Sequence, residues 1–240
     1  AKSRKEKRSS INKNTTDADV PLDGKILIMI FEKPSTRTRI SFDLAVKQLG
    51  GKSLILNPDE IHYGSGDESL HDTAKVLSQY ADIVMLRTPA HKNVEEFSKY
   101  LDIPIINGLT NLSHPCQIMS DVMTFEELKG PIKNKKIAYL GDGNNIVYSL
   151  IEASVQFDFE LCIACPKGFG PNVNILKWAK ENNAKISVIK DPLKAASSAD
   201  CVMTDKWISM SDKVNKKKKK KTLKPYQVNK KIMEKAKKDS

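Results

Sequence analysis

The chain has 240 residues and a formal net charge of +11, which is enough material for one large domain or two smaller ones with their own hydrophobic cores. No apolar run approaches the roughly 20 residues that a membrane-spanning helix needs. The first residues also lack a signal-peptide pattern, so neither a membrane protein nor a secreted protein is expected. The charge is unevenly spread, because residues 213–240 carry thirteen lysines against two acidic residues, while residues 9–212 carry 22 basic and 26 acidic residues.

Short apolar runs rich in β-formers alternate with helical patterns along the first half of the chain. The predicted strands are 25–30, 53–56, 82–87 and 104–107. The predicted helices are 38–49, 68–80 and 92–100, followed by a longer one at 117–129. That longer helix ends at Gly130 and Pro131, two residues that commonly stop helices.

The alternation restarts after residue 130. The predicted strands are 136–140, 159–164, 186–189 and 201–204, and the helices between them are 144–156, 172–183 and 192–198. Several strands are continuous apolar runs, which suits parallel strands covered on both faces. The sequence therefore predicts an α/β protein with two doubly wound parallel-sheet domains of similar size, joined by the long helix.

The expected domains are a basic flexible segment at 1–20, a first domain at 21–129 and a second domain at 130–240. The lysine run 216–221 could contact nucleic acid or anionic lipid. Because no aromatic residues interleave with it and no nucleic-acid motif accompanies it, a solvated, mobile loop is favoured. No nucleic-acid or membrane partner is therefore expected.

Four cysteines, Cys116, Cys162, Cys165 and Cys201, are scattered through the chain. A chain of this size does not need disulfides, so reduced thiols in a reducing compartment are expected. Cys162 and Cys165 form a C-x-x-C pattern, but a zinc site would need a second pair. They lie in a predicted buried strand, where positions three apart face opposite ways. We therefore expect core residues and no metal.

In open parallel sheets, ligands bind at the carboxyl ends of the strands, and the segment FEKPSTRTR ends the first strand. Residues 35–38 begin a helix, whose first N–H groups are unpaired and whose dipole is positive at that end. The Ser and Thr hydroxyls and the Arg37 guanidinium add donors. This pattern predicts an anion site suited to phosphate. The alternative is a well-capped helix with a surface arginine.

Polar residues also follow the third and fourth strands. Arg87 ends the third, and HPCQ follows the fourth. His114 and Gln117 could both reach a carbonyl near the start of the long helix, although a histidine there is most often a neighbour of a cap. Cys116 beside His114 is not expected to form a nucleophilic dyad, because adjacent helical positions diverge.

The second half offers two further strand ends. GDGNN at 141–145 lacks the third glycine of a dinucleotide-binding fingerprint, since that position is Ile146. A small polar ligand is therefore favoured. Asp205, with Ser209 and Met210, follows the last strand, and its carboxylate could hold an ammonium group. The alternative for Asp205 is a helix or turn cap.

Together, FEKPSTRTR, HPCQ, GDGNN and DKWISM occur in the order seen in ornithine carbamoyltransferases, and the chain resembles that family from about residue 20 onwards. The sister family, the aspartate carbamoyltransferases, shares the STRTR and HP-x-Q elements. It usually has one residue fewer between Phe-Glu and STRTR, and it lacks the DxWxSM segment. Lys33 and Pro34 both intervene here, so the resemblance favours ornithine over aspartate as the acceptor.

The resemblance implies transfer of the carbamoyl group of carbamoyl phosphate to the δ-amine of L-ornithine, in arginine metabolism, with no metal or organic cofactor. The implied carbamoyl phosphate ligands are Ser35, Thr36, Arg37, Thr38, His62, Arg87, His114 and Gln117. Among these, the implied catalytic residues are Arg37, Arg87 and His114. The implied ornithine ligands are Asn145, Asp205, Ser209 and Met210. Arg39 is expected to be structural and paired with an acid.

Two departures from the family pattern stand out. His62 occupies the position where the family delivers a glutamine from a neighbouring subunit, and its charge would vary near neutral pH. That loop implies a homotrimer, and a cytoplasmic location is expected, or the mitochondrial matrix in a eukaryote. The family also has a leading helix before residue 1 and a His-Cys-Leu-Pro segment beyond residue 240, so truncation at both ends is expected.

Three alternatives follow. The chain could be an inactive truncated form of such an enzyme, or a carbamoyltransferase for another amine such as putrescine or aspartate. More distantly, it could be a polyanion-binding protein that uses the lysine-rich tail.

Overall fold

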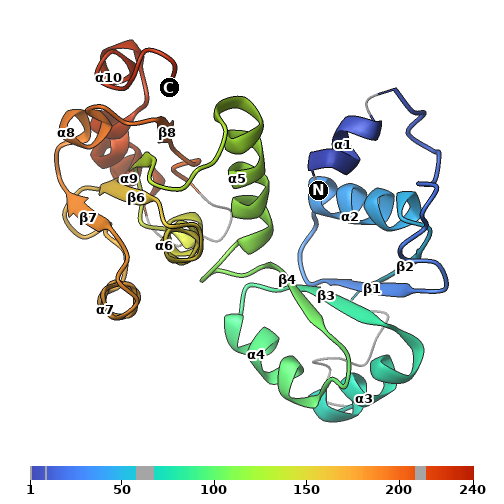
Figure 1. Ribbon diagram of the computed structural model, residues 1–240. Helices are drawn as coiled ribbons and strands as arrows, with labels where there is room; N and C mark the ends of the chain where they lie inside the picture. The colour runs from blue at the N-terminus through green and yellow to red at the C-terminus, as the bar shows by residue number, and fades with distance from the viewer. Residues whose placement is uncertain (1, 9, 58–67, 209–214) are drawn as a thin grey trace. The chain divides into compact units, whose positions relative to one another are not determined.

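The computed structural model describes residues 2–8, 10–57, 68–208 and 215–240. They fall into two units, Ala1–Cys116 and Gln117–Ser240, each built on its own four-stranded parallel sheet (Figure 1). The division lies at the start of helix α5 (Pro115–Lys129), whereas the sequence suggested a boundary at the end of that helix.

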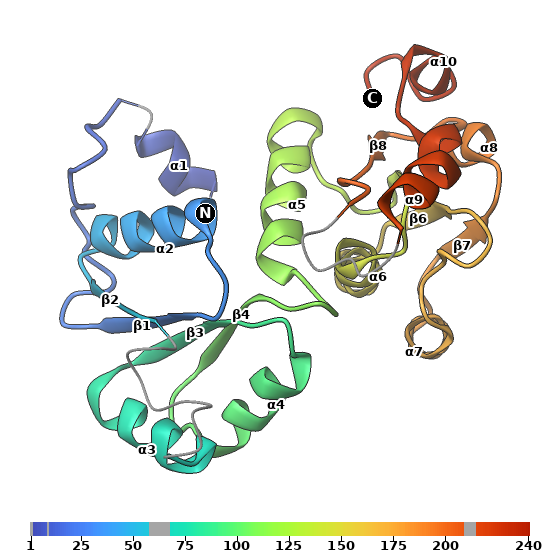
Figure 2. The ribbon, with the colours of Figure 1, turned by 180° about the vertical axis from the view of Figure 1, so that it is seen from behind.

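The first unit has a sheet with the strand order β2-β1-β3-β4. Its strands are β1 (Ile26–Phe31), β2 (Lys52–Leu56), β3 (Ile83–Arg87) and β4 (Ile105–Leu109). Its helices are α1 (Lys2–Arg8), α2 (Thr36–Gln48), α3 (Leu70–Tyr80) and α4 (His91–Tyr100). Side chains of β1 and β3 alternate between a cluster with α3 and α4 and a cluster with α2. Both faces of the sheet are therefore covered, as Figures 1 and 2 show from opposite sides.

The second unit has the strand order β7-β6-β5-β8. Its strands are β5 (Lys136–Leu140), β6 (Glu160–Ala164), β7 (Ile186–Ile189) and β8 (Cys201–Met203). Its helices are α5, α6 (Asn145–Phe157), α7 (Val173–Glu181), α8 (Pro192–Ala196), α9 (Lys216–Leu223), the 3-10 helix η2 (Lys224–Tyr226) and α10 (Lys230–Met233). Helices α5, α6 and α7 cover one face of the sheet, while α8, η2 and α10 contribute to the core on the other.

The two cysteines of the C-x-x-C pattern confirm this layering. Cys165 lies in the cluster with α5, α6 and α7, and Cys162 lies in the cluster on the opposite face. Both side chains are buried, so the prediction of core residues is confirmed.

All eight predicted strands and all seven predicted helices are present, with ends that differ by at most two residues. The prediction of a parallel α/β fold with two doubly wound sheets is therefore confirmed. No helix within the described ranges is both long enough and apolar enough to cross a membrane.

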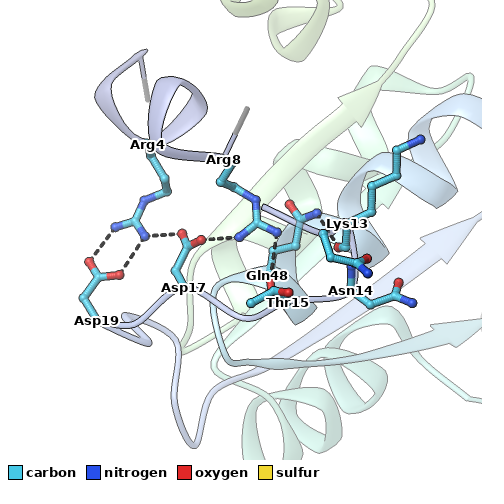
Figure 3. Close-up of polar contacts among 9 residues, drawn as sticks. Arg4, Arg8, Lys13, Asn14, Thr15, Asp17, Asp19 and Gln48 are labelled. Carbon is cyan, nitrogen blue, oxygen red and sulfur yellow. Dashed lines mark hydrogen bonds and ion pairs between the residues drawn. The ribbon is translucent and has the colours of Figure 1, made fainter. Parts of the chain in front are cut away.

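The basic ends contain two helices that the sequence did not predict, so the expected loop at 216–221 is wrong. The segment expected to be flexible contains α1, whose Arg4 pairs with Asp17 and Asp19 and whose Arg8 also pairs with Asp17 (Figure 3). The lysine run expected to be a mobile loop forms α9, and the Asn215 side chain caps it by accepting from two backbone N–H groups. Ion pairing stabilises α1, and this cap stabilises the start of α9.

Candidate active site

The first candidate site lies at the topological switch point of the first sheet, where successive strands are added on opposite sides of β1. The chain passes from β1 to β2 on one side and then returns to β3 on the other, so the switch point lies between β1 and β3. Ligands bind at such points, beyond the carboxyl ends of the strands. Phe31 and Arg87, the last residues of β1 and β3, are register partners. The segments predicted to bind phosphate therefore leave the sheet side by side.

The start of α2 is well suited to an anion. Ser35 is its N-cap residue, with φ −149° and ψ 106°, but its side chain makes no capping hydrogen bond, and the first turn holds no acidic residue. The hydroxyl that would normally satisfy a backbone donor is therefore not used for capping. The exposed N–H groups of the first turn and the helix dipole favour a bound anion.

Arg87 extends from β3 to the same place. Its Nη1 donates to Oγ1 of Thr38, in the first turn of α2, at 2.9 Å. Burial lowers the pKa of Arg87, and the neighbouring charge of Arg37 lowers it further. The partly buried Arg87 and the exposed Arg37 thus lie near each other beside a helix N-terminus. This concentration of positive charge would be relieved by a dianion such as a phosphate.

A partly buried polar network supports this site. Glu32, just after β1, accepts from Oγ1 of Thr88 at 2.7 Å and from Nδ2 of Asn93 at 3.3 Å. Thr88 is 1% exposed and its Oγ1 also accepts from the backbone N–H of Ala90 at 3.2 Å. The segments that follow β1 and β3 are therefore joined by hydrogen bonds. The sequence did not identify Glu32 or Asn93, because their pairing joins residues about sixty positions apart.

The segment after β4 leads to His114. A β-bulge shifts the register between β3 and β4, and Leu109 has φ 147°, a conformation that few non-glycine residues adopt. Oγ1 of Thr110 then accepts from the N–H groups of Leu112 and Ser113 at 3.2 and 3.1 Å. Bulges and strained residues are frequent beside functional sites. Here they place His114, whose Nδ1 is buried, directly before α5.

Cys116 does not have the features of a nucleophile. Its thiol donates to the backbone carbonyl of Asn107 at 3.4 Å, and burial raises its pKa. Reactive cysteines usually have a lowered pKa. The expectation that Cys116 and His114 form no dyad agrees with this arrangement.

Gln117 is the first residue of the second unit, and its Nε2 donates to Oδ1 of Asp121, one helical turn later, at 2.8 Å. Its contact with carbamoyl phosphate stays a prediction.

The second candidate site lies at the switch point of the second sheet, between β5 and β8. Asn144 caps α6 by accepting from the N–H groups of Ile146 and Val147 at 3.0 and 3.4 Å. Its Nδ2 donates to Oδ2 of Asp205 at 2.7 Å. The structure thus joins the GDGNN loop to the segment after β8, and Asn145, the predicted ligand, is the first residue of α6. The sequence missed Asn144, which supports Asp205 directly.

Several carboxylates lie near this second switch point. Burial raises the pKa of the Tyr139 phenol strongly, and the charges of Asp205 and Asp142 raise it further. Burial also raises the pKa of Asp121, and the negative charge of Asp205 raises it further. Because Asp142 is paired with Lys219, Asp205 and Asp121 are the carboxylates that favour a ligand carrying an ammonium group.

The described residues do not include His62, Ser209 or Met210, so these predicted ligands stay predictions. Among the residues that are described, no group of three or more His, Cys, Asp or Glu side chains is placed to hold a metal ion. Arg39 is exposed and its charge lowers the pKa of Asp43, after larger effects from Ser53 and Lys47. Asp43 pairs with Lys47 and Ser53, and the pairing of Arg39 with an acid stays a prediction.

Two family models match almost the whole chain. Residues 1–127 match the carbamoyl-P binding domain of aspartate/ornithine carbamoyltransferases, and residues 133–240 match their Asp/Orn binding domain. The chain belongs to the aspartate/ornithine carbamoyltransferase family. The resemblance found in the sequence is therefore confirmed, and the two matched domains correspond to the two sheets.

Similar proteins include ornithine carbamoyltransferases from several microorganisms. The one from Brucella ovis is 50% identical over 220 residues, which cover 92% of this chain and 70% of that protein. The one from Paracoccus denitrificans is 45% identical over 241 residues, covering all of this chain and 78% of that protein. The structure of the ornithine carbamoyltransferase from Pyrococcus furiosus has a TM-score of 0.85 and 43% identity, covering 92% of this chain and 71% of that one.

Proposed function

We propose that this carbamoyltransferase family member transfers the carbamoyl group of carbamoyl phosphate to the δ-amine of L-ornithine, giving L-citrulline and phosphate. The strongest support is the convergence of donors at the ends of β1 and β3, where Arg87 donates to Thr38 at the start of α2 and Arg37 lies nearby. The similar proteins from Brucella, Paracoccus and Pyrococcus all carry the name ornithine carbamoyltransferase.

On the phosphate side, the substrate dianion would accept charge-assisted hydrogen bonds from Arg37 and Arg87, hydroxyl donors from Ser35 and Thr38, and N–H groups of the first turn of α2, including that of Thr36. Arg87 and Thr38 already share a hydrogen bond in the structure, and donors held in this way need little reorganisation during the reaction. Binding would also fix the carbamoyl group near His114, which would donate a hydrogen bond to its carbonyl oxygen as negative charge develops there.

The chemical step needs the acceptor amine in its neutral form. The amine nitrogen attacks the carbonyl carbon, a C–N bond forms, and the C–O bond to the phosphate breaks. The leaving phosphate keeps the bonding electron pair, and the nitrogen loses one proton to phosphate or water. Catalysis would therefore come mainly from positioning and from preorganised positive charge.

On the acceptor side, the carboxylates of Asp205 and Asp121 favour a cationic acceptor over the dicarboxylate aspartate. Asp205, which accepts from Asn144, would take an ammonium group of ornithine. The roles of Asn145, Ser209 and Met210 as further ornithine ligands, and of His62 and Gln117 as carbamoyl phosphate ligands, belong to the same proposal. Putrescine would satisfy the charge requirement too, but it lacks the carboxylate of ornithine.

We also propose a homotrimer in the cytoplasm. The trimer follows from the loop that reaches across a subunit boundary in the family, and light scattering on the purified protein would measure it. The cytoplasmic location is supported by four cysteines that are all free thiols in the structure.

Acceptor competition tests the substrate assignment. The protein is given labelled carbamoyl phosphate with ornithine, putrescine or aspartate, and the carbamoylated product is identified by mass spectrometry. Ornithine should be carbamoylated most efficiently, and Asp205→Asn should raise the KM for ornithine without a comparable change for carbamoyl phosphate. Preferred carbamoylation of aspartate or putrescine would contradict the assignment.

A further inference from the structure

One lysine of the basic run differs from its neighbours. Residues 216–221 are six consecutive lysines, and all are exposed except Lys219, which is 7% exposed. Lys219 and Leu223 are one helical turn apart, so they share the face of α9 that packs inward, and Leu223 is fully buried. The Nζ of Lys219 lies 2.5 Å from Oδ2 of Asp142, whose side chain is 19% exposed. A buried lysine is rarely found without such a partner.

Asp142 belongs to the GDGNN loop of the candidate acceptor site. Its backbone carbonyl accepts from the N–H of Asn144 at 2.8 Å, and the Asn144 amide in turn holds Asp205 at 2.7 Å. A path of three short contacts therefore links Lys219 to the carboxylate that would bind the acceptor.

The loop has little freedom to adjust by itself. The N–H of Gly143 donates to the carbonyl of Phe169 at 2.7 Å, and a Cβ at Gly143 would lie only 2.6 Å from the backbone carbon of Gly170. Interiors packed this closely transmit displacements rather than absorb them. A change in the position of Asp142 would therefore move Asn144, and with it Asp205.

The pair also sets the charge of the acceptor site. Asp142 and Asp205 both lie near the Tyr139 phenol, so an unneutralised Asp142 would repel Asp205 and compete with it for the ammonium group of the acceptor. The ammonium of Lys219 cancels the charge of Asp142 and leaves that of Asp205 available.

We propose that Lys219 is a positioning residue for acceptor binding, because it holds Asp142 and so fixes the 141–145 loop with Asp205 as the carboxylate that receives the acceptor. This role rests on the proposed carbamoyl transfer to ornithine. It also takes Lys219 out of the set of lysines that a polyanion could contact.

Steady-state kinetics on the full chain test the role. Lys219→Met should raise the KM for ornithine at least tenfold and leave the KM for carbamoyl phosphate within twofold, because Ser35, Thr38 and Arg87 belong to the other unit. Lys219→Arg should return the KM for ornithine to within threefold of the original value. Lys218→Met is the matched control, since it removes the same charge from an exposed neighbour in α9, and it should leave both KM values unchanged.

The double variant Lys219→Met with Asp142→Asn guards against a folding defect, because it leaves no buried charge without a partner. It should recover part of the ornithine KM lost in Lys219→Met. An unchanged ornithine KM in Lys219→Met, an equal rise in both KM values, or the same defect in Lys218→Met would each overturn the role. If the unmodified chain makes no citrulline, the proposed function fails instead, which separates the two failures.

Discussion

Replacing Arg87 with methionine tests how much its partly buried charge destabilises the protein when no ligand is bound. Burial and the nearby charge of Arg37 both lower the pKa of Arg87, so the folded protein disfavours the charged side chain that the unfolded chain tolerates. Methionine keeps an apolar stem and removes the charge. The hydrogen bond to Thr38 is lost, worth about 0.5–1.5 kcal/mol, and the relief of repulsion offsets it. We therefore expect a melting temperature within about 3 °C of the original, given about 2–4 °C per kcal/mol for a chain of this size.

The effect on ligand binding should be much larger. One N–H of Arg87 is taken by Thr38, which leaves four of the five guanidinium donors. Two charge-assisted hydrogen bonds to phosphate oxygens, at about 1.5–3 kcal/mol each, give about 3–6 kcal/mol. Their loss corresponds to binding weaker by about two to four orders of magnitude.

Thermal shift measurements test both parts. Carbamoyl phosphate at 100 times its dissociation constant should stabilise the original protein by about 2.7 kcal/mol, or about 5–11 °C. Arg87→Met should show almost none of this shift. Arg39→Met is the control, because Arg39 is an exposed arginine of α2, the helix whose start forms the candidate site, and it should keep the full shift. A full shift in Arg87→Met, or an equal loss in Arg39→Met, would refute the assignment of the pocket.

Other predictions concern the second unit and the N-terminal helix. Gly143→Ala should destabilise the protein by about 1–3 kcal/mol in urea titrations, because the new Cβ would lie 2.6 Å from backbone atoms of the neighbouring loop. Asp121→Asn should raise the melting temperature at neutral pH, since burial raises the pKa of Asp121. This advantage should shrink as the pH falls through the folded pKa of Asp121 and disappear below its unfolded value. Asp17→Asn should speed amide hydrogen exchange in α1. The hydrogen bond from Arg4 lowers the pKa of Asp17, and losing this charged partner would free the helix to open. Unchanged exchange would contradict the pairing shown in Figure 3.

The regular core could be predicted from the sequence because the information is local. Continuous apolar runs such as 136–140 and 159–164 indicate buried parallel strands, and their order with the intervening helices gives the doubly wound sheets. Helix α1 could not be predicted, because Lys2–Arg8 has no apolar periodicity and pairs with acidic residues further along the chain. Helix α9 was missed because six identical lysines carry no periodic pattern, although Asn215 and Leu223 mark its two ends.

In the candidate site, too, local sequence patterns indicated some residues, while others depend on contacts between distant parts of the chain. Reasoning about strand ends pointed to Arg87 and Asp205, since Arg87 ends one predicted strand and Asp205 follows another. It did not find Asn144, Asp142 or Lys219 as supporting residues, because their contacts join positions more than sixty residues apart. Local patterns thus identified candidate ligand-binding residues, whereas the side chains that support these candidates could be identified only from the fold.

Citrulline formation tests the central claim most directly. The purified chain is mixed with carbamoyl phosphate labelled with ¹³C at the carbonyl carbon and with L-ornithine, and the label is followed by NMR. The account predicts ¹³C-citrulline in amounts equal to the phosphate released, with a rate that falls sharply in Arg87→Met. Phosphate release without citrulline, or citrulline formation at the same rate in Arg87→Met, would contradict it.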